Sequence, residues 1–126
     1  MKNKADIGKK GERFCASYFE KLGYKIVSCN YHSRFGEIDV IAENENLLVF
    51  AEVKTRSENR IAEAREAVTP TKQKKIMLTA LDFISKNKTE KQIRFDVFEV
   101  LVNENGRIYK FRNIENAFDF DESLIY

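Results

Sequence analysis

Asp39, Glu52 and Lys54 have a spacing that could place a metal ion, bound by the two carboxylates, next to the ammonium group of the lysine. Apolar runs at 38–42 and 47–53 flank the turn-forming triplet Asn-Glu-Asn, which predicts a β-hairpin. If the hairpin closes on a two-residue loop, its register places Asp39 directly opposite Glu52. Any loop of even length centred there gives the same pairing, whereas a loop of odd length shifts it by one residue.

An opposed pair of carboxylates destabilises a hairpin unless a cation binds between them. Opposed residues have Cβ atoms roughly 4.5–5.5 Å apart, and two carboxylates at about 5 Å repel by roughly 3 kcal/mol at an effective dielectric of 20. A divalent cation turns this repulsion into binding, and hard oxygen ligands suit Mg²⁺ or Mn²⁺. Strand alternation places Lys54 on the same face of its strand as Glu52. On the other strand it places Glu37, Asp39 and Ile41 together on one face. The alternative is a solvated acidic face on which Lys54 pairs with Glu37.

A third carboxylate lies upstream on a predicted helix. Residues 6–22 have helical periodicity, and Gly23 follows as a suitable C-terminal residue. The apolar face of this helix consists of Cys15, Tyr18, Phe19 and Leu22, with Ala16 at its edge. Glu12 lies on the flank of this face, so it is a candidate third ligand. The alternative is a surface glutamate paired with Lys9 or Arg13.

The remaining elements complete an alternation of strands and helices. They are a strand at 24–31, a basic turn at 32–35, a helix from an N-cap at Thr69 to about Asn87 with Ile76, Met77, Ala80, Leu81 and Ile84 on one face, a strand at 93–102, and a hairpin through Asn105-Gly106 into 107–112. Residues 55–68 fit either a mobile loop or a short helix bordering the substrate. Asp96 interrupts its strand beside Arg94, which predicts a structural ion pair.

Length and composition are those of one ordinary globular domain over residues 1–126. The first ten residues have no apolar run typical of a signal peptide, and no later run reaches transmembrane length. We therefore expect a cytoplasmic protein that has no membrane partner. Cys15 and Cys29 fit no metal-ligand spacing, and we expect both to be reduced and buried.

The charged residues form blocks. Residues 37–53 carry five acidic and no basic groups, residues 1–36 carry eight basic and three acidic groups, and residues 54–94 carry eleven basic and five acidic groups. An acidic strip between basic segments suits a metal site that acts on a polyanion. Three lysines, Lys72, Lys74 and Lys75, also lie in the first turns of a helix, where cations oppose the helix dipole unless an anion docks there. A solvated face is the alternative for each of them.

Other chemistries lack support in the sequence. His32 is the single histidine, which argues against His-rich zinc sites and Ser-His-Asp hydrolases. Neither G-x-x-x-x-G-K-[ST] nor G-x-G-x-x-G is present, so nucleotide-cofactor binding is not indicated.

The pattern D-x12-E-V-K, ending at Lys54 and preceded by Glu12 on a helix, resembles the PD-(D/E)XK nuclease superfamily. More closely, the chain resembles the small bacterial YraN family of endonuclease-like proteins, which are similar to archaeal Holliday junction resolvases. The segments that carry the resemblance are Gly11–Tyr24, Gly36–Ala42, Leu48–Arg56, Arg94–Val97 and Ile114–Phe118.

The resemblance implies an α/β fold, a restriction-endonuclease-like αβββαβ core with a central mixed sheet flanked by helices. It assigns metal-ligand roles to Asp39 and Glu52, a transition-state or water-positioning role to Lys54, and an accessory metal role to Glu12. The superfamily's proline is replaced by Ile38 here.

The expected function is that of a Mg²⁺- or Mn²⁺-dependent nuclease acting on nucleic acid, with DNA, including structured or branched DNA, as the partner that the resemblance implies. The expected phosphate contacts are Arg34, Arg56, Lys72, Lys74 and Lys75, with Arg34 standing in for the family's usual arginine, which is His32 in this chain. Cleavage of a four-way junction needs two sites and therefore a homodimer. One alternative is a non-catalytic nucleic-acid-binding protein that keeps the nuclease fold. Another is a protein-interaction module whose acidic strip binds a basic partner.

Overall fold

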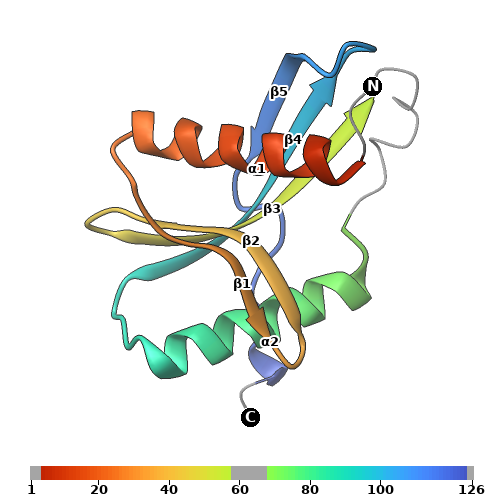
Figure 1. Cartoon of the computed structure of the whole chain (residues 1–126). Helices are drawn as coiled ribbons and strands as arrows, with labels where there is room; N and C mark the ends of the chain where they lie inside the picture. The colour runs from red at the N-terminus through yellow and green to blue at the C-terminus, as the bar shows by residue number, and fades with distance from the viewer. Residues whose placement is uncertain (1–3, 58–67, 125–126) are drawn as a thin grey trace.

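The computed structural model describes residues 4–57 and 68–124 (Figure 1). Its elements in chain order are α1 (Lys4–Lys21), β1 (Lys25–Ser33), β2 (Gly36–Glu43), β3 (Leu47–Ser57), α2 (Pro70–Lys86), β4 (Gln92–Val102), β5 (Ile108–Ile114) and the 3-10 helix η2 (Glu122–Leu124). This is the predicted αβββαβ order followed by one further strand. None of the described helices is long and apolar enough to cross a membrane.

The five strands of the described residues form one mixed sheet in the order β1-β2-β3-β4-β5, in which β3 and β4 are parallel and the other neighbours antiparallel. Because parallel neighbours need a crossover connection, α2 lies between them in the chain and packs on the sheet. The cluster against α2 contains Ile38, Ile41, Leu48, Phe50, Phe95 and Val97 from the strands. The cluster against α1 contains Val40, Ala42, Val49, Ala51, Phe98, Val100 and Val102. The predicted fold class is confirmed.

The ladder between β2 and β3 is much shorter than its neighbours. It runs from the Glu43–Leu48 pair only to the Val40–Ala51 pair, whereas β3 stays paired with β4 as far as Ser57. Beyond Val40 and Ala51, β2 is paired with β1 alone and β3 with β4 alone. Figure 1 shows the β1–β2 hairpin bending towards α2 while β3 and β4 continue past α1. We call the point of separation, where Asp39 and Glu52 are the first residues beyond the ladder, the fork.

Strand β2 changes its facing at the fork. Ile38 and Ile41 both pack in the α2 cluster, although Val40 between them packs in the α1 cluster. On β1, Asn30 has a φ of 56°, in the left-handed region, and this backbone kink accompanies the change. Strict alternation along β2, which the sequence pattern assumed for Glu37 to Ile41, is therefore wrong.

Helix α1 ends in a Schellman motif at Gly23, whose φ is +93°. The Tyr24 amide donates to the Phe19 carbonyl (2.9 Å) and the Gly23 amide to the Glu20 carbonyl (3.0 Å). The Tyr24 ring then packs edge-on against Phe19. The predicted helix end is confirmed, but Leu22 is 56% exposed and does not belong to the apolar face, because the chain reverses directly after it.

Helix α2 begins and ends as predicted. Thr69 is its N-cap and accepts the Lys72 amide, Pro70 is its first residue, and Asn87 is its C-cap. Its buried residues are Ile76, Met77, Thr79, Ala80 and Phe83, whereas Leu81 and Ile84 are only partly buried. The axis of the apolar face is thus rotated slightly from the predicted one, towards Thr79 and Phe83.

Asp96 on β4 has the structural role that the sequence indicated. Its carboxylate accepts two hydrogen bonds from Arg94, both at 2.8 Å, and it is 1% exposed. It also accepts the side-chain amide of Asn113 and the backbone amide of Asn116. This buried carboxylate therefore joins β4 to β5 and to the chain after β5, and its role is structural.

Three smaller expectations need correction. Strand β3 continues to Ser57, so 55–57 are strand, and residues 58–67 of the expected loop or short helix lie outside the described residues. His32 belongs to β1, because the turn is confined to residues 34–35. Cys29 is exposed, whereas Cys15 is buried as expected.

Gly11 lets α1 approach β3 closely. A Cβ atom built on Gly11 would lie 2.1 Å from the Thr55 hydroxyl oxygen, well inside any real contact. By contrast, a Cβ atom on Gly8, one turn earlier, would meet nothing within 4 Å. The glycine therefore sets the distance between β3 and the helix that carries Glu12.

We expect Gly11→Ala to lower the free energy of unfolding by about 1–3 kcal/mol, because the clash outweighs the better helix propensity of alanine. Gly8→Ala is the matched control and should leave stability unchanged or raise it by up to about 1 kcal/mol. Urea unfolding measures both, and adding Thr55→Ala should restore most of what Gly11→Ala loses. Equal stability of the two alanine variants would contradict the close approach.

Candidate functional site

At the fork, a side chain replaces the missing backbone partner. The Val53 amide, which no longer faces a β2 carbonyl in the ladder, donates to Asp39 Oδ2 at 2.8 Å. An unpaired buried amide costs about 1–3 kcal/mol, so this bond satisfies the amide at the fork and fixes the carboxylate. The predicted register is confirmed, since Asp39 and Glu52 follow directly after the Val40–Ala51 pair.

The two carboxylates interact strongly. Burial raises the pKa of Asp39 to about 7, and the neighbouring charge of Glu52 adds to the shift. Burial also raises the pKa of Glu52, although Lys54 works in the opposite direction. Both groups therefore resist ionisation together in the absence of a cation.

Lys54 lies two residues after Glu52 on the same strand, β3, and forms an ion pair with it. Its Nζ lies 3.6 Å from Glu52 Oε1, and the two side chains are 16% and 20% exposed. Burial lowers the pKa of Lys54, the Glu52 carboxylate opposes that shift, and the Lys72 ammonium reinforces it. Glu37 instead lies 3.5 Å from His32 Nε2, so the alternative pairing of Lys54 with Glu37 does not occur.

Glu12 reaches this region from α1 and is partly buried. Burial raises its pKa, a hydrogen bond from the Asn30 side chain opposes the shift, and the Glu37 carboxylate adds to it. The charge of Glu12 in turn contributes to the raised pKa of Asp39. However, within residues 4–57 and 68–124 no three His, Cys, Asp or Glu side chains already form a group that could hold a metal ion.

The donor set nevertheless suits one ion. Asp39 and Glu52 provide hard carboxylate oxygens, burial raises the pKa of both, and the Glu52 charge adds to the rise at Asp39. Mg²⁺ in proteins is commonly held by one or two carboxylates, with water and substrate phosphate completing the octahedron. Two first ligands at the fork, with Glu12 available as a more distant third, fit that pattern better than they fit a site closed by protein alone.

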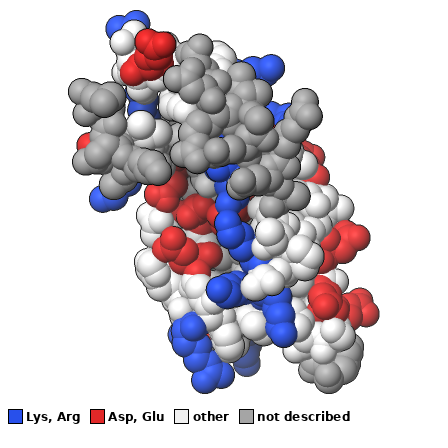
Figure 2. All heavy atoms as spheres, turned by 90° about the vertical axis from the view of Figure 1, so that its right-hand side faces the viewer, with Lys and Arg blue, Asp and Glu red and all other residues white. Residues whose placement is uncertain are grey.

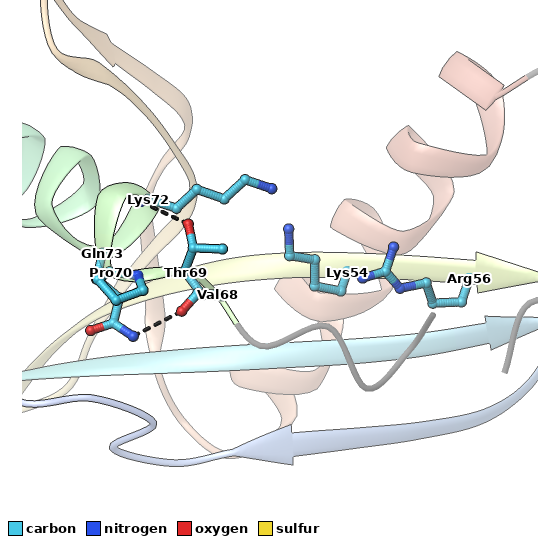
Figure 3. A pocket seen from close by; sticks show the side chains of 7 residues that line it. All are labelled: Lys54, Arg56, Val68, Thr69, Pro70, Lys72 and Gln73. Atoms are coloured by element: carbon cyan, nitrogen blue, oxygen red, sulfur yellow. Dashed lines mark hydrogen bonds between the residues drawn. The ribbon is translucent and has the colours of Figure 1, made fainter. Parts of the chain in front are cut away.

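Basic side chains line a pocket next to the carboxylates. Figure 2 shows acidic side chains gathered beside a line of basic side chains on one face of the molecule. Lys54, Arg56 and Lys72 are among the residues that line the pocket (Figure 3). The other expected phosphate contacts lie on exposed surface away from its lining, Lys74 and Lys75 on α2 and Arg34 over the ring of Phe35 in the β1–β2 turn.

Two further residues belong to the site's surroundings, and the sequence pattern had placed only Glu37 near Asp39, without a role in the site. The Glu37 carboxylate is one of the charges that add to the effect of burial on Glu12, Asp39 and Glu52. Asn30 hydrogen-bonds Glu12 from the kinked position on β1. Glu37 is separated from Asp39 by one residue and was recognisable as a nearby charge, whereas nothing in the sequence marked Asn30.

Comparisons with known proteins find one family along most of the chain. The family model described as "Uncharacterised protein family UPF0102" matches residues 11–100. A UPF0102 protein of Caldicellulosiruptor saccharolyticus is 37% identical over 117 residues, which cover 92% of this chain and 99% of that protein. A UPF0102 protein of Sulfurihydrogenibium sp. is 39% identical, with 94% of this chain and 99% of that protein covered. One from Clostridium botulinum (strain Loch Maree) is 42% identical, with 90% and 94% covered.

The raised pKa of Asp39 predicts a pH-dependent stability. A carboxyl group whose pKa is higher in the folded protein binds its proton more tightly there, so stability falls as pH rises from about 4 through about 7. In a chelator, Asp39→Asn should therefore gain stability relative to the unmodified protein between pH 5 and pH 8, on the order of 2 kcal/mol. Urea unfolding at four pH values measures this difference.

Glu45→Gln is the control, because it removes one exposed carboxylate in the loop between β2 and β3, outside the fork. Addition of Mg²⁺ at pH 8 should stabilise the unmodified protein and leave Asp39→Asn unchanged. Parallel pH profiles for the unmodified protein and Asp39→Asn would show that the two fork carboxylates do not repel as described.

Proposed function

The chain belongs to the UPF0102 family, the YraN family that its sequence resembles, and we propose that it is a metal-dependent nuclease hydrolysing phosphodiester bonds in nucleic acid. The observation that carries the proposal is the pair of largely buried carboxylates at the fork with Lys54 beside them. A sheet without a cation to bind gains nothing from opposing two carboxylates at the point where two strands separate.

In this proposal Asp39 and Glu52 hold Mg²⁺ or Mn²⁺, with Glu12 as an accessory ligand. When bound, the ion lowers the pKa of a water molecule and neutralises charge that develops on the phosphate. The Val53 amide keeps the Asp39 carboxylate in place during substrate binding. Lys54, held near Glu52, orients the attacking water or donates to a phosphate oxygen as its negative charge grows.

The chain's basic side chains would bind the strand on either side of the cleaved bond. Arg56 and Lys72 lie nearest to the fork, in the pocket that Lys54 also lines. Lys74 and Lys75 on α2 and Arg34 at the β1–β2 turn would contact more distant phosphates of the partner, for which we propose DNA, including branched forms. Cleavage of a junction at two symmetric positions would require a homodimer.

A nucleic-acid-binding protein that has lost catalysis would use the same basic surface. Such a protein has no need of the fork carboxylates, because like charges next to a phosphate weaken binding. The pH-dependent cost of keeping Asp39 and Glu52 together therefore favours the nuclease over the binder.

Lys54→Ala and Asp39→Asn should separate the nuclease from the binder. Lys54→Ala should bind metal and nucleic acid nearly as the unmodified protein does, while Mg²⁺-dependent cleavage falls by roughly 10²–10³, the usual effect of removing one transition-state donor. Asp39→Asn should lose both metal binding and cleavage, because it removes ligand charge. The measurement is single-turnover cleavage of labelled single strands, duplexes, flaps and junctions, beside metal titration by calorimetry.

Matched controls come from the turn end of the β2–β3 hairpin and from the residue before β4 that contacts it. Glu43 and Lys91 form an ion pair of 3.0 Å away from the fork, so Glu43→Gln and Lys91→Ala should cleave at the unmodified rate. If no substrate class is cleaved with either metal, or Lys54→Ala cleaves at the unmodified rate, the proposed chemistry is wrong.

A further inference from the structure

A pocket of about 470 Å³ opens between the end of β3 and the start of α2. The described residues that line it are Lys54, Arg56, Val68, Thr69, Pro70, Lys72 and Gln73. Three of these carry positive charge and none is a carboxylate, so the pocket is basic although it adjoins the acidic fork. It shares Lys54 with the fork, which makes the two sites neighbours.

The three basic side chains of the lining point towards one region, although Lys72 is itself an exposed residue. Figure 3 shows Lys54 rising from β3, the Arg56 guanidinium lying beside it, and Lys72 extending from α2 towards the same space. Like charges that face one another cost free energy unless an anion lies between them. Lys72 also lies in the first turn of α2, where a cation opposes the helix dipole.

Side chains, not helix amides, would bind an anion here. The Lys72 amide donates to Thr69 Oγ1 (3.2 Å) and the Gln73 amide to the Thr69 carbonyl (2.8 Å). The side-chain amide of Gln73 donates to the Val68 carbonyl at 2.8 Å. These bonds occupy the amides of Lys72 and Gln73, so the Lys72 side chain is the cationic group that α2 presents to the pocket.

We propose that this pocket binds a phosphate group of the nucleic acid, the one adjacent in the strand to the phosphate cleaved at the fork. The inference rests on the proposed function for the identity of the strand, but the phosphate site itself does not need a metal. The pocket is larger than a phosphate group requires, and Val68 and Pro70 give it an apolar wall on which the attached sugar can rest. The substrate is then a strand with at least two consecutive phosphates.

Inorganic phosphate titrated into the protein in excess chelator tests the site without metal or cleavage. Amide chemical shifts should move at Lys54, Arg56 and Lys72, and Lys72→Ala should weaken the fitted affinity about tenfold, as expected for the loss of one charged contact. Lys88→Ala, an exposed lysine beyond the other end of α2, removes the same net charge and should leave the affinity unchanged. Equal affinity in both variants, or shifts spread over the whole basic surface, would overturn the inference.

Short substrates test the link to the fork. In Mn²⁺ a dinucleotide with an additional terminal phosphate should be cleaved at least tenfold faster than one with a single internal phosphate, and Lys72→Ala should abolish that preference while Lys88→Ala keeps it. Equal cleavage of both substrates, with phosphate still bound in the pocket, would remove the pocket from the reaction. If neither substrate nor longer nucleic acid is cleaved, the proposed function fails, and the metal-free titration still decides whether the pocket binds phosphate.

Discussion

The site depends on the place where β2 and β3 stop pairing. Four residue pairs join the two strands, and beyond Val40 and Ala51 the sheet divides. The Val53 amide would be left without a partner there, and Asp39 supplies one. A single hydrogen bond thus satisfies the backbone amide at the end of the ladder and fixes the Asp39 carboxylate beside Glu52. The same bond therefore determines where the site lies and places one of its negative charges.

The two faces of the sheet contribute to the site in different ways. On one face, Gly11 allows α1 to lie close to β3, which brings Glu12 towards the acidic group. On the other, the crossover between the parallel strands places the start of α2, with Lys72, next to Lys54. Because the fork is open to both faces, carboxylates and cations from distant parts of the chain meet there. The carboxylates repel one another, and so do the cations. These repulsions are a cost in the free protein that a metal ion and a phosphate group would relieve together.

The hairpin register and the helix ends could be predicted from the sequence, because they depend on residues that are neighbours along the chain. The Asn-Glu-Asn turn set the hairpin register, Gly23 ended α1, and the Thr69-Pro70 pair started α2. The failures arose where tertiary structure overrides a periodic pattern. Leu22 fits the helical period, yet the chain reverses at the next residue and leaves it exposed. The change of facing at Asp39 accompanies a backbone kink across the ladder at Asn30, which no strand pattern can reveal. Likewise, the division of the lysines into pocket and surface groups depends on where α2 docks.

The most direct test of the central claim, that the fork is a metal site, is anomalous scattering from crystals grown with Mn²⁺. We expect one peak between the Asp39 and Glu52 carboxylates, with metal–oxygen distances of about 2.0–2.2 Å, and no peak at the same position in Asp39→Asn crystals. A well-occupied peak elsewhere on the protein, with the fork empty at the same Mn²⁺ concentration, would contradict it.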